Sequence, residues 1–297
     1  MEKKYDSLTI FEFQEQFPDN DSCQNYLAEM KWPDGFKCEK CGHNRYCGGK
    51  LAHTHQCTKC KYQATPTSGT LFHKVKFPLL KAFYIVFYMG TSKKGIASTE
   101  LSRKLGLRQK TCWLFQQKVM KAMASSGKYP LIGKVEVDET VVGQQEEGVV
   151  GRQNNRKKQV VLAIEKKGKG VGRMYARVIN NAGSKQLKPF FRDHISTEAT
   201  IKTDKWRGYM PLKKQYPNLL QIDSGKKGKN FPDLHRTIMM FKAWLRGIHH
   251  SVDNLQAYLD QYCYRFNRSQ MKGAIFDNLL ARMVEHNPCP YNIICMY

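Results

Sequence analysis

The sequence predicts a multidomain α/β protein with a small cysteine-rich domain, a helical region and a mixed β-sheet flanked by helices. Three observations predict this organisation. Four cysteines form two closely spaced pairs before residue 61, helical periodicity dominates residues 71–124, and alternating strand patterns begin at residue 134. The 297 residues are enough for about two domains.

The composition is that of a folded and strongly basic protein. Hydrophobic residues make up 41% of the chain, which is too many for an intrinsically disordered one. The net charge is +24, and because residues 1–34 carry a net charge of −5, the remainder carries +29. This favours a polyanionic partner, since neutralising phosphates releases counterions. A nonspecific basic surface, as in ribosomal proteins, is the alternative that charge alone leaves open.

The sequence contains no pattern typical of a membrane or secreted protein. No apolar run approaches the roughly 18 residues that span a bilayer. The N-terminus also lacks a basic segment followed by an apolar stretch. We therefore expect a cytoplasmic protein without a membrane partner.

The first pattern with specific chemistry is a set of four cysteines. They form two Cys-x-x-Cys pairs separated by fifteen residues, namely Cys38, Cys41, Cys57 and Cys60. Each pair can bind one tetrahedral ion from a tight turn, and the separation fits two hairpin knuckles with short strands near Tyr46 and Gln56. We predict a structural Zn²⁺ in a zinc ribbon. Two disulfide or redox pairs are the alternative, which the lack of a secretion signal disfavours.

Other possible ligands lie in the same stretch. They are His43, Cys47, His53 and His55, but the four paired cysteines already complete a closed structural site. The remaining cysteines have no ligand spacing among themselves. We expect core residues or free thiols at Cys23, Cys112, Cys263, Cys289 and Cys295.

Helical patterns follow the cysteines. Apolar residues recur at helical spacing after Pro78, and two shorter helical patterns then flank Gly106, where Ser98 or Thr99 is expected to cap the first. This outline predicts a helix-turn-helix whose second helix lies in a DNA major groove. The residues expected to face outward are Arg108, Gln109, Lys110 and Gln116 or Gln117. A helical hairpin of ordinary core packing is the alternative.

The second half of the chain changes to strand patterns after a boundary at 124–133 that contains Ser, Gly and Pro. Strands are predicted at 134–142, 157–167 and 172–180, with a polar surface loop between the first two. A helix at 184–195, a strand at 199–204, a helical segment, a strand at 219–223 and two long amphipathic helices follow. This order is that of an RNase H-like fold.

Two aspartates fall where this fold brings strands together. Asp138 is midway along the first strand and Asp204 is at the C-terminal end of the fourth, which is its neighbour in such a fold. Carboxylates so placed repel unless a cation lies between them, and two metal ions there activate an attacking oxygen and stabilise a leaving one. The pair predicts a nuclease or strand-transferase site. For either acid alone, a solvated strand-end carboxylate is the commoner explanation.

Five stretches of the chain resemble the zinc-ribbon DDE transposases of bacterial insertion sequences, the ISXO2-like group. They are CEKCGHNRYC, HQCTKCKYQATPTSGTLFH, VEVDETVVG, TDKWRGY and LRGIHHSVDNLQAYLDQYCYRFNRS, in the family's order and over nearly all of the chain. The resemblance implies a DNA transposase in which Asp138 and Asp204 bind Mg²⁺ or Mn²⁺. Water would attack a phosphodiester at the transposon end, and the freed 3′ hydroxyl would then attack target DNA.

The third metal position departs from the family's simple pattern. A glutamate or asparagine is expected near the start of the helix before the RGI triplet, but the chain reads FPDLHRTIMMFKAWLRGI. Counting back places His235 there, similar to a DDH subgroup of the family, and Lys242 lies two turns later on the same face. We expect His235 to be the third ligand and Lys242 to contact a DNA phosphate. Asp233 is the alternative carboxylate, and a capping or core role is the alternative for His235.

Further DNA contacts are expected beside the metal site and near the end of a later helix. They are Trp206, Arg207, Tyr209, Arg265, Asn267 and Arg268, for which packing or a solvated face is the alternative. The resemblance implies double-stranded DNA as partner, both terminal inverted repeats and target, and a homodimer or larger synaptic assembly. It also implies a bacterial cytoplasmic protein that is nucleoid-associated when bound to DNA.

The sequence leaves two other classes of function open. One is a regulator that kept DNA binding and lost catalysis, and the other is a nuclease that cuts without joining ends. The predictions divide the chain into an acidic helical segment 1–34, a zinc ribbon 35–70, a helical and helix-turn-helix region 71–124, an RNase H-like catalytic domain 132–268, and a C-terminal helix and tail 269–297.

Overall fold

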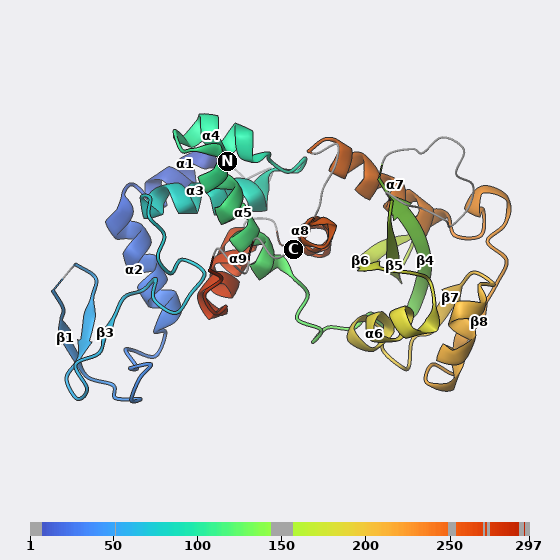
Figure 1. Ribbon diagram of the computed structural model, residues 1–297, viewed down its shortest axis with the longest axis horizontal. Coiled ribbons are helices and arrows are strands. Elements are labelled where there is room, and N and C mark those ends of the chain that lie inside the picture. Colours follow the sequence, from blue (N-terminus) through green and yellow to red (C-terminus); the bar gives the residue numbers. More distant parts are fainter. Residues whose placement is uncertain are drawn as a thin grey trace. The chain divides into compact units, whose positions relative to one another are not determined.

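The computed structural model describes residues 8–50, 52–143, 157–248, 254–269, 271, 274–290 and 294 (Figure 1). The chain forms two compact units. The first comprises Met1–Met123 with Met271–Tyr297, and the second comprises Ala124–Gln270. The polar loop expected between the first two strands of the large sheet falls at 144–156, outside the described residues. None of the described helices is both long and apolar enough to cross a membrane.

The first unit begins with two capped helices and a small sheet. Helices α1 (Ile10–Gln16) and α2 (Asn20–Lys31) each start with a capping box, at Thr9 and Asp19. Strands β1 (Tyr46–Gly48), β2 (His55–Cys57) and β3 (Gln63–Ala64) then form an antiparallel sheet in that order. The short strands expected near Tyr46 and Gln56 are therefore confirmed.

The remaining helices of the first unit come from both ends of the chain. They are α3 (Leu79–Thr91), α4 (Ser98–Leu105), α5 (Gln109–Met123) and α9 (Ala274–Glu285). Helix α9 contacts α2, α3 and α5. Its Phe276 ring lies 5.6 Å from that of Phe13 and 5.7 Å from that of Phe17, in a shared aromatic core. The last helix of the chain is thus part of the core of the N-terminal unit.

The helix-turn-helix outline is present, but its start differs from expectation. Gly106 follows α4 in the left-handed conformation, with φ 60° and ψ 40°, as a glycine after a helix often does. The expected cap at Ser98 or Thr99 is wrong, because Ala97 is the N-cap and makes no side-chain hydrogen bond. Ser98 is buried, and its hydroxyl accepts a 2.7 Å hydrogen bond from the Gln109 amide.

Fewer polar residues of α5 are exposed than the sequence predicts. The sequence predicts that Gln116 or Gln117 faces outward, which is wrong because both are buried. The Gln116 amide donates to the Ile96 carbonyl at 2.9 Å, so a polar side chain is used to fix the preceding loop.

The second unit is built on a five-stranded sheet. The strands are β4 (Lys134–Val142), β5 (Lys158–Lys167), β6 (Gly170–Ile179), β7 (Thr200–Thr203) and β8 (Leu219–Gln221). Their order is β6-β5-β4-β7-β8. The first three pair antiparallel, and β4, β7 and β8 pair parallel. This is the RNase H-like arrangement that the order of elements predicted.

Helices cover the sheet on both faces. On one face, α6 (Ser184–His194) and the 3₁₀ helix η1 (Arg207–Lys214) pack against the apolar side of β4 and β5 in one buried cluster. On the face that carries Asp138, α7 (Pro232–Arg246) contacts β4 and β5, and the short 3₁₀ helix η2 (Lys226–Gly228) precedes it. The sheet is therefore buried on both sides, which explains the apolar runs of β5.

Helix α8 (Leu255–Asn267) covers the free edge of β6. The Gln256 amide accepts from Val178 N–H at 2.9 Å and donates to the Ala176 carbonyl at 3.3 Å. Three turns later, the Asn267 amide accepts from Met174 N–H at 2.7 Å and donates to its carbonyl at 2.9 Å. These two side-chain amides bind backbone N–H and C=O groups at the edge of β6 with which another strand would otherwise pair. Asn267, expected to contact DNA, is thus engaged with the sheet.

Candidate active site

The four paired cysteines converge at one point of the ribbon. Their Sγ atoms all lie within 4.8 Å of one another, and the Cys38–Cys60 and Cys41–Cys57 pairs are each 3.6 Å apart. Tetrahedral thiolates at a Zn–S distance of about 2.3 Å stand about 3.8 Å apart, so the spacing fits one ion. The site is a structural zinc site, as the spacing of the cysteines predicted.

The two cysteine knuckles are built alike. Gly42 and Lys61, each four residues after the first cysteine of its pair, have φ values of 72° and 60°. Their N–H groups donate to the carbonyls of Cys38 and Cys57, at 2.8 and 3.0 Å. Each loop therefore reverses tightly enough to direct both of its thiolates to one ion.

The competing ligands in this stretch are engaged elsewhere. The exposed Cys47 thiol donates to the Gln56 carbonyl at 3.6 Å, and His53 pairs with Asp21 at 3.0 Å. His43 bonds to the Thr58 hydroxyl, and the His55 ring stacks on the rings of Tyr46 and Trp32. The cysteine cluster is therefore closed by its four members.

In the second unit, Asp138 and Asp204 lie side by side. Strands β4 and β7 are parallel, with Val135 opposite Ile201 and Glu136 opposite Lys202. Continuing this register by two residues sets Asp138 in the middle of β4 beside Asp204, just past the end of β7. Their carboxylate oxygens lie within 4.8 Å of each other. The fold thus brings Asp138 and Asp204 together, as the order of the strands predicted.

A third carboxylate joins this pair. Oxygens of Glu139 lie within the same 4.8 Å of those of Asp138 and Asp204, and we call these three residues the acidic cluster. Glu139 is not among the residues expected at this site, and alternation along a strand directs its side chain to the face opposite Asp138. Two unit charges about 5 Å apart repel by about 3 kcal/mol at an effective dielectric constant near 20. Three such charges favour binding of a cation.

His235 approaches the cluster from the first turn of α7. Its Nε2 atom lies 3.8 Å from Asp138 Oδ2. This nitrogen is buried and has no hydrogen-bond partner among the residues that the structure describes. Two ligands of one Mg²⁺ or Mn²⁺ ion, each about 2.1 Å from the metal, are at most about 4.2 Å apart. His235 and Asp138 are therefore close enough to bind one divalent cation, whereas the group whose ligand atoms all lie within 4.8 Å of one another comprises Asp138, Glu139 and Asp204 without His235.

Asp233, the alternative carboxylate, is paired with two basic side chains. It forms ion pairs with Lys166 of β5 and, at 2.6 Å, with Arg236 one turn along α7. Its side chain is only 14% exposed. These contacts attach the first turn of α7 to β5 and so fix the position of His235.

Gly228 of η2 packs directly against the imidazole of His235. Its φ is 73°, and a Cβ atom built at this position would overlap the ring. A glycine at this position therefore does two things, because it accepts the left-handed conformation and leaves space for the histidine. Sequence patterns gave no signal for this contact, since it depends on how the loop folds over α7.

The segment after Asp204 is fixed by backbone contacts. The Asp204 carboxylate accepts from Trp206 N–H at 3.0 Å, and the Trp206 indole donates to the Ala182 carbonyl at 2.8 Å. The Gln221 amide of β8 donates to the Trp206 carbonyl at 2.8 Å. Trp206 thus packs and orients the loop, and its expected contact with DNA stays a prediction. Tyr209 is completely buried, so its expected contact with DNA is wrong.

Lys242 lies on α7 near other basic side chains. Burial lowers the pKa of its ammonium, and the positive charges of Arg246 and Lys157 lower the pKa further. An anion between these three side chains would relieve their repulsion. The expected phosphate contact of Lys242 is consistent with this field and stays a prediction.

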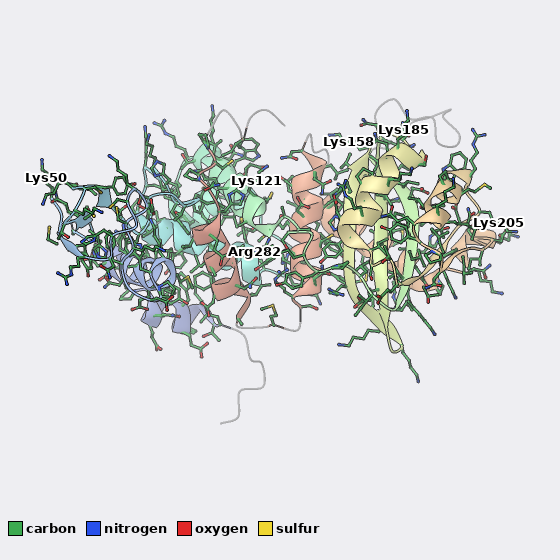
Figure 2. All side chains as sticks on the ribbon, turned by 90° about the horizontal axis from the view of Figure 1, so that it is seen from below. Lys50, Lys121, Lys158, Lys185, Lys205 and Arg282 are labelled. Carbon is green, nitrogen blue, oxygen red and sulfur yellow. The ribbon has the colours of Figure 1, made fainter. Side chains whose placement is uncertain are left out.

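The other residues expected to contact DNA differ in exposure. Arg108, Gln109 and Lys110 at the start of α5 are exposed, as is Arg207. Arg265 is mostly withdrawn from solvent, and burial lowers its pKa to about 10. The Arg268 guanidinium lies 4.1 Å from the centre of the Tyr264 ring. Figure 2 shows basic side chains on both units, among them Lys50 and Lys121 on the first and Lys158, Lys185 and Lys205 on the second.

Two family models match the chain. Residues 130–267 match the ISXO2-like transposase domain, and residues 18–63 match the transposase zinc-ribbon domain. Together they match more than half of the chain. The first contains the acidic cluster and His235, and the second contains all four zinc-binding cysteines. No curated protein sequence matches the chain.

Solved structures of another transposase are distantly similar. One is a pre-cleavage Mos1 transpososome, with 10% identity, a TM-score of 0.29, and coverage of 67% of this chain and 76% of that chain. Another is the Mos1 strand transfer complex, with 13% identity, a TM-score of 0.29, and coverage of 68% and 76%. Superposition at these TM-scores is weak, so the two family models are the comparison that bears on function.

Proposed function

Because the chain is a DNA transposase with an ISXO2-like transposase domain, we propose that it cuts and joins DNA at a divalent metal site formed by Asp138, Asp204 and His235. The observation that carries the proposal is the approach of Asp138 to Asp204 on adjacent parallel strands, with His235 Nε2 3.8 Å from Asp138 Oδ2. Mg²⁺ or Mn²⁺ bound there would supply positive charge that activates the attacking oxygen and stabilises the leaving oxygen.

Asp138 has the central role among these residues. Its carboxylate lies within 4.8 Å of that of Asp204 and 3.8 Å from His235 Nε2, a position suited to a ligand shared by two ions. Its Oδ1 accepts a 2.8 Å hydrogen bond from Glu139 N–H, which fixes the carboxylate and leaves Oδ2 toward His235. Such fixed orientation is what in-line phosphoryl transfer demands of its catalyst.

The proposed reaction consists of two phosphoryl transfers. In the first, a water oxygen bonds to phosphorus at the transposon end, and the bond from phosphorus to the 3′ oxygen breaks. In the second, the freed 3′ hydroxyl bonds to a phosphorus of target DNA, and one target phosphodiester bond breaks. The second step makes one phosphodiester for each one broken, so it needs no external energy source.

The basic side chains near α7 support DNA positioning at this site. Lys242, Arg246 and Lys157 would hold a phosphate of the DNA, because the positive charges of Arg246 and Lys157 act on the Lys242 ammonium. We assign Arg207, Arg265 and Arg268 to the same role along the DNA backbone.

The first unit would hold the ends of the insertion sequence. The zinc ribbon supplies a fold stabilised by its ion, and α5 presents Arg108, Gln109 and Lys110 at its exposed N-terminal end, as a recognition helix does. Terminal inverted repeats and target DNA are the proposed partners. Since two ends must be joined, a homodimer or larger synaptic assembly is the proposed active form.

A strand-transfer assay tests the proposal. Zinc-loaded full-length protein is incubated with Mg²⁺ or Mn²⁺ and labelled duplexes from the element's termini, uncut or with pre-cut 3′ ends. We expect D138N, D204N and H235A to lose cleavage and joining by about a hundredfold or more while DNA binding is retained. Cleavage without joining of pre-cut ends would indicate a nuclease, and binding without either reaction would indicate a regulator.

The same assay decides the third ligand. We expect H235A to abolish cleavage and D233N to reduce it less, because Asp233 only anchors α7 through Lys166 and Arg236. If H235A cleaved normally while D233N did not, Asp233 would be the ligand.

A further inference from the structure

Glu139 belongs to the acidic cluster although its side chain leaves the other face of the strand. It shares that face with Val135 and Val137, which lie in the apolar cluster beneath α6 and η1. Its carboxylate nonetheless reaches within 4.8 Å of the oxygens of both Asp138 and Asp204. Both Glu139 oxygens are buried from solvent. The cluster therefore receives a carboxylate from each face of the sheet.

Tyr209, like the Glu139 carboxylate, is buried from solvent near the acidic cluster. The residue is 0% exposed, and its hydroxyl oxygen is buried without a hydrogen bond of ordinary geometry among the described residues. Burial raises the pKa of Tyr209 well above its ordinary value, and the nearby charges of Glu139 and Asp138 raise it further. The Tyr209 hydroxyl therefore lies near the Glu139 carboxylate, on the face of the sheet that Glu139 shares with Val135 and Val137.

The position of Tyr209 is set by the backbone of its neighbours. A Cβ atom at Gly208 would overlap the Ala182 carbonyl, which is also the acceptor of the Trp206 indole N–H. The start of η1 therefore packs closely against Ala182. This contact fixes the backbone at the start of η1, which carries Tyr209.

We propose that Glu139 is an additional carboxylate ligand of the cation held by Asp138 and Asp204, and that the Tyr209 hydroxyl orients Glu139 by hydrogen bonding. The inference rests on the proposed metal-dependent function and adds a residue to it. Hard divalent cations prefer oxygen ligands, and a third carboxylate would strengthen a site that lacks enough oxygens from two aspartates. Tyr209 is accordingly a positioning residue, since it acts through Glu139.

Manganese binding to the DNA-free, zinc-loaded, full-length protein tests this directly. Affinity is measured by the electron paramagnetic resonance signal of free Mn²⁺. We expect E139Q to weaken binding by about tenfold and Y209F by a smaller factor, in the range seen when groups that support metal ligands are removed. E198Q is the matched control, because Glu198 is exposed and precedes β7, at the end opposite Asp204.

Thermal unfolding without added Mn²⁺ separates a ligand from a merely structural residue. E139Q keeps the shape of the side chain and removes one charge from the cluster, so we expect its melting temperature to rise relative to wild type. Added Mn²⁺ should then raise it less than in wild type. A melting temperature that falls, or an unchanged Mn²⁺ affinity, would overturn the inference.

The test also distinguishes this inference from the proposed function. If D138N and D204N abolish Mn²⁺ binding while E139Q binds like wild type, Glu139 is not a ligand and the proposed site stands. If D138N and D204N also bind like wild type, the proposed metal site itself is wrong.

Discussion

His235 Nε2 lies 3.8 Å from Asp138 Oδ2, although the two residues are on α7 and on the central strand β4. This relationship joins two elements that are nearly a hundred residues apart in sequence. It depends on three local contacts, namely the ion pairs of Asp233 with Lys166 and Arg236, and the close packing of Gly228 on the imidazole. Changes at these contacts should therefore alter catalysis without touching the acids.

Replacing Gly228 by alanine should displace His235. The added Cβ overlaps the imidazole, and the left-handed φ of 73° costs a non-glycine residue about 1 kcal/mol. We expect G228A to reduce DNA cleavage by about tenfold or more. The matched control is G168A, because Gly168 also has a positive φ, 57°, but has open space around its Cβ position. Equal cleavage by the two variants would show that His235 has not been displaced.

Lys242 should contribute one ionic contact to DNA. We expect K242Q to weaken DNA binding and to reduce the slope of log affinity against log salt by about one, because one phosphate contact is lost. K242R keeps the charge and should keep the slope. A salt dependence of K242Q identical to that of wild type would place Lys242 outside the DNA interface.

Local patterns predicted most of the fold and the acid pair. The spacing of Cys38, Cys41, Cys57 and Cys60 encodes the zinc site directly, because both knuckles are local turns. Asp138 and Asp204 could be paired because the order of elements fixes which strands are neighbours. The start of α4 was predicted less well, because the Ser98 hydroxyl makes a tertiary hydrogen bond with Gln109 and does not cap the helix.

What the sequence did not reveal depends on tertiary packing. Glu139 joins the cluster although alternation along β4 assigns its side chain to the opposite, apolar face. Gln116 is polar and yet buried, since the Ile96 carbonyl needs a donor. Asn267 is expected from the sequence to contact DNA, and only the placement of α8 along β6 identifies its partner as Met174.

The zinc ribbon should hold one ion per chain through its four clustered cysteines alone. We expect C57S to lose bound zinc, because three thiolates leave the tetrahedral site open. C47S should retain it, since Cys47 is exposed and lies outside the cluster. Zinc content is measured by inductively coupled plasma mass spectrometry. Zinc loss in C47S as complete as in C57S would contradict the assignment.

Acid should destabilise the second unit through His194. This imidazole is buried beside the Arg177 guanidinium, and its pKa is lowered to about 4, by burial first and then by the Arg177 charge. Because the unfolded chain binds the proton at a higher pH, near 6.5, the stabilisation is complete above that pH. It declines as the pH falls from about 6.5 toward 4, by about 3 kcal/mol in all.

The variant H194Q, with a neutral side chain at every pH, isolates this effect. Thermal unfolding measured across the same range should show a shallower decline for H194Q than for wild type. Parallel declines would mean that another group governs acid sensitivity.

Anomalous scattering from crystals grown with Mn²⁺ tests the central claim most directly. We predict an anomalous peak between the carboxylates of Asp138 and Asp204, next to His235, which disappears in D138N crystals grown in the same way. Manganese bound elsewhere on the protein, with no peak at the acidic cluster, would contradict the account.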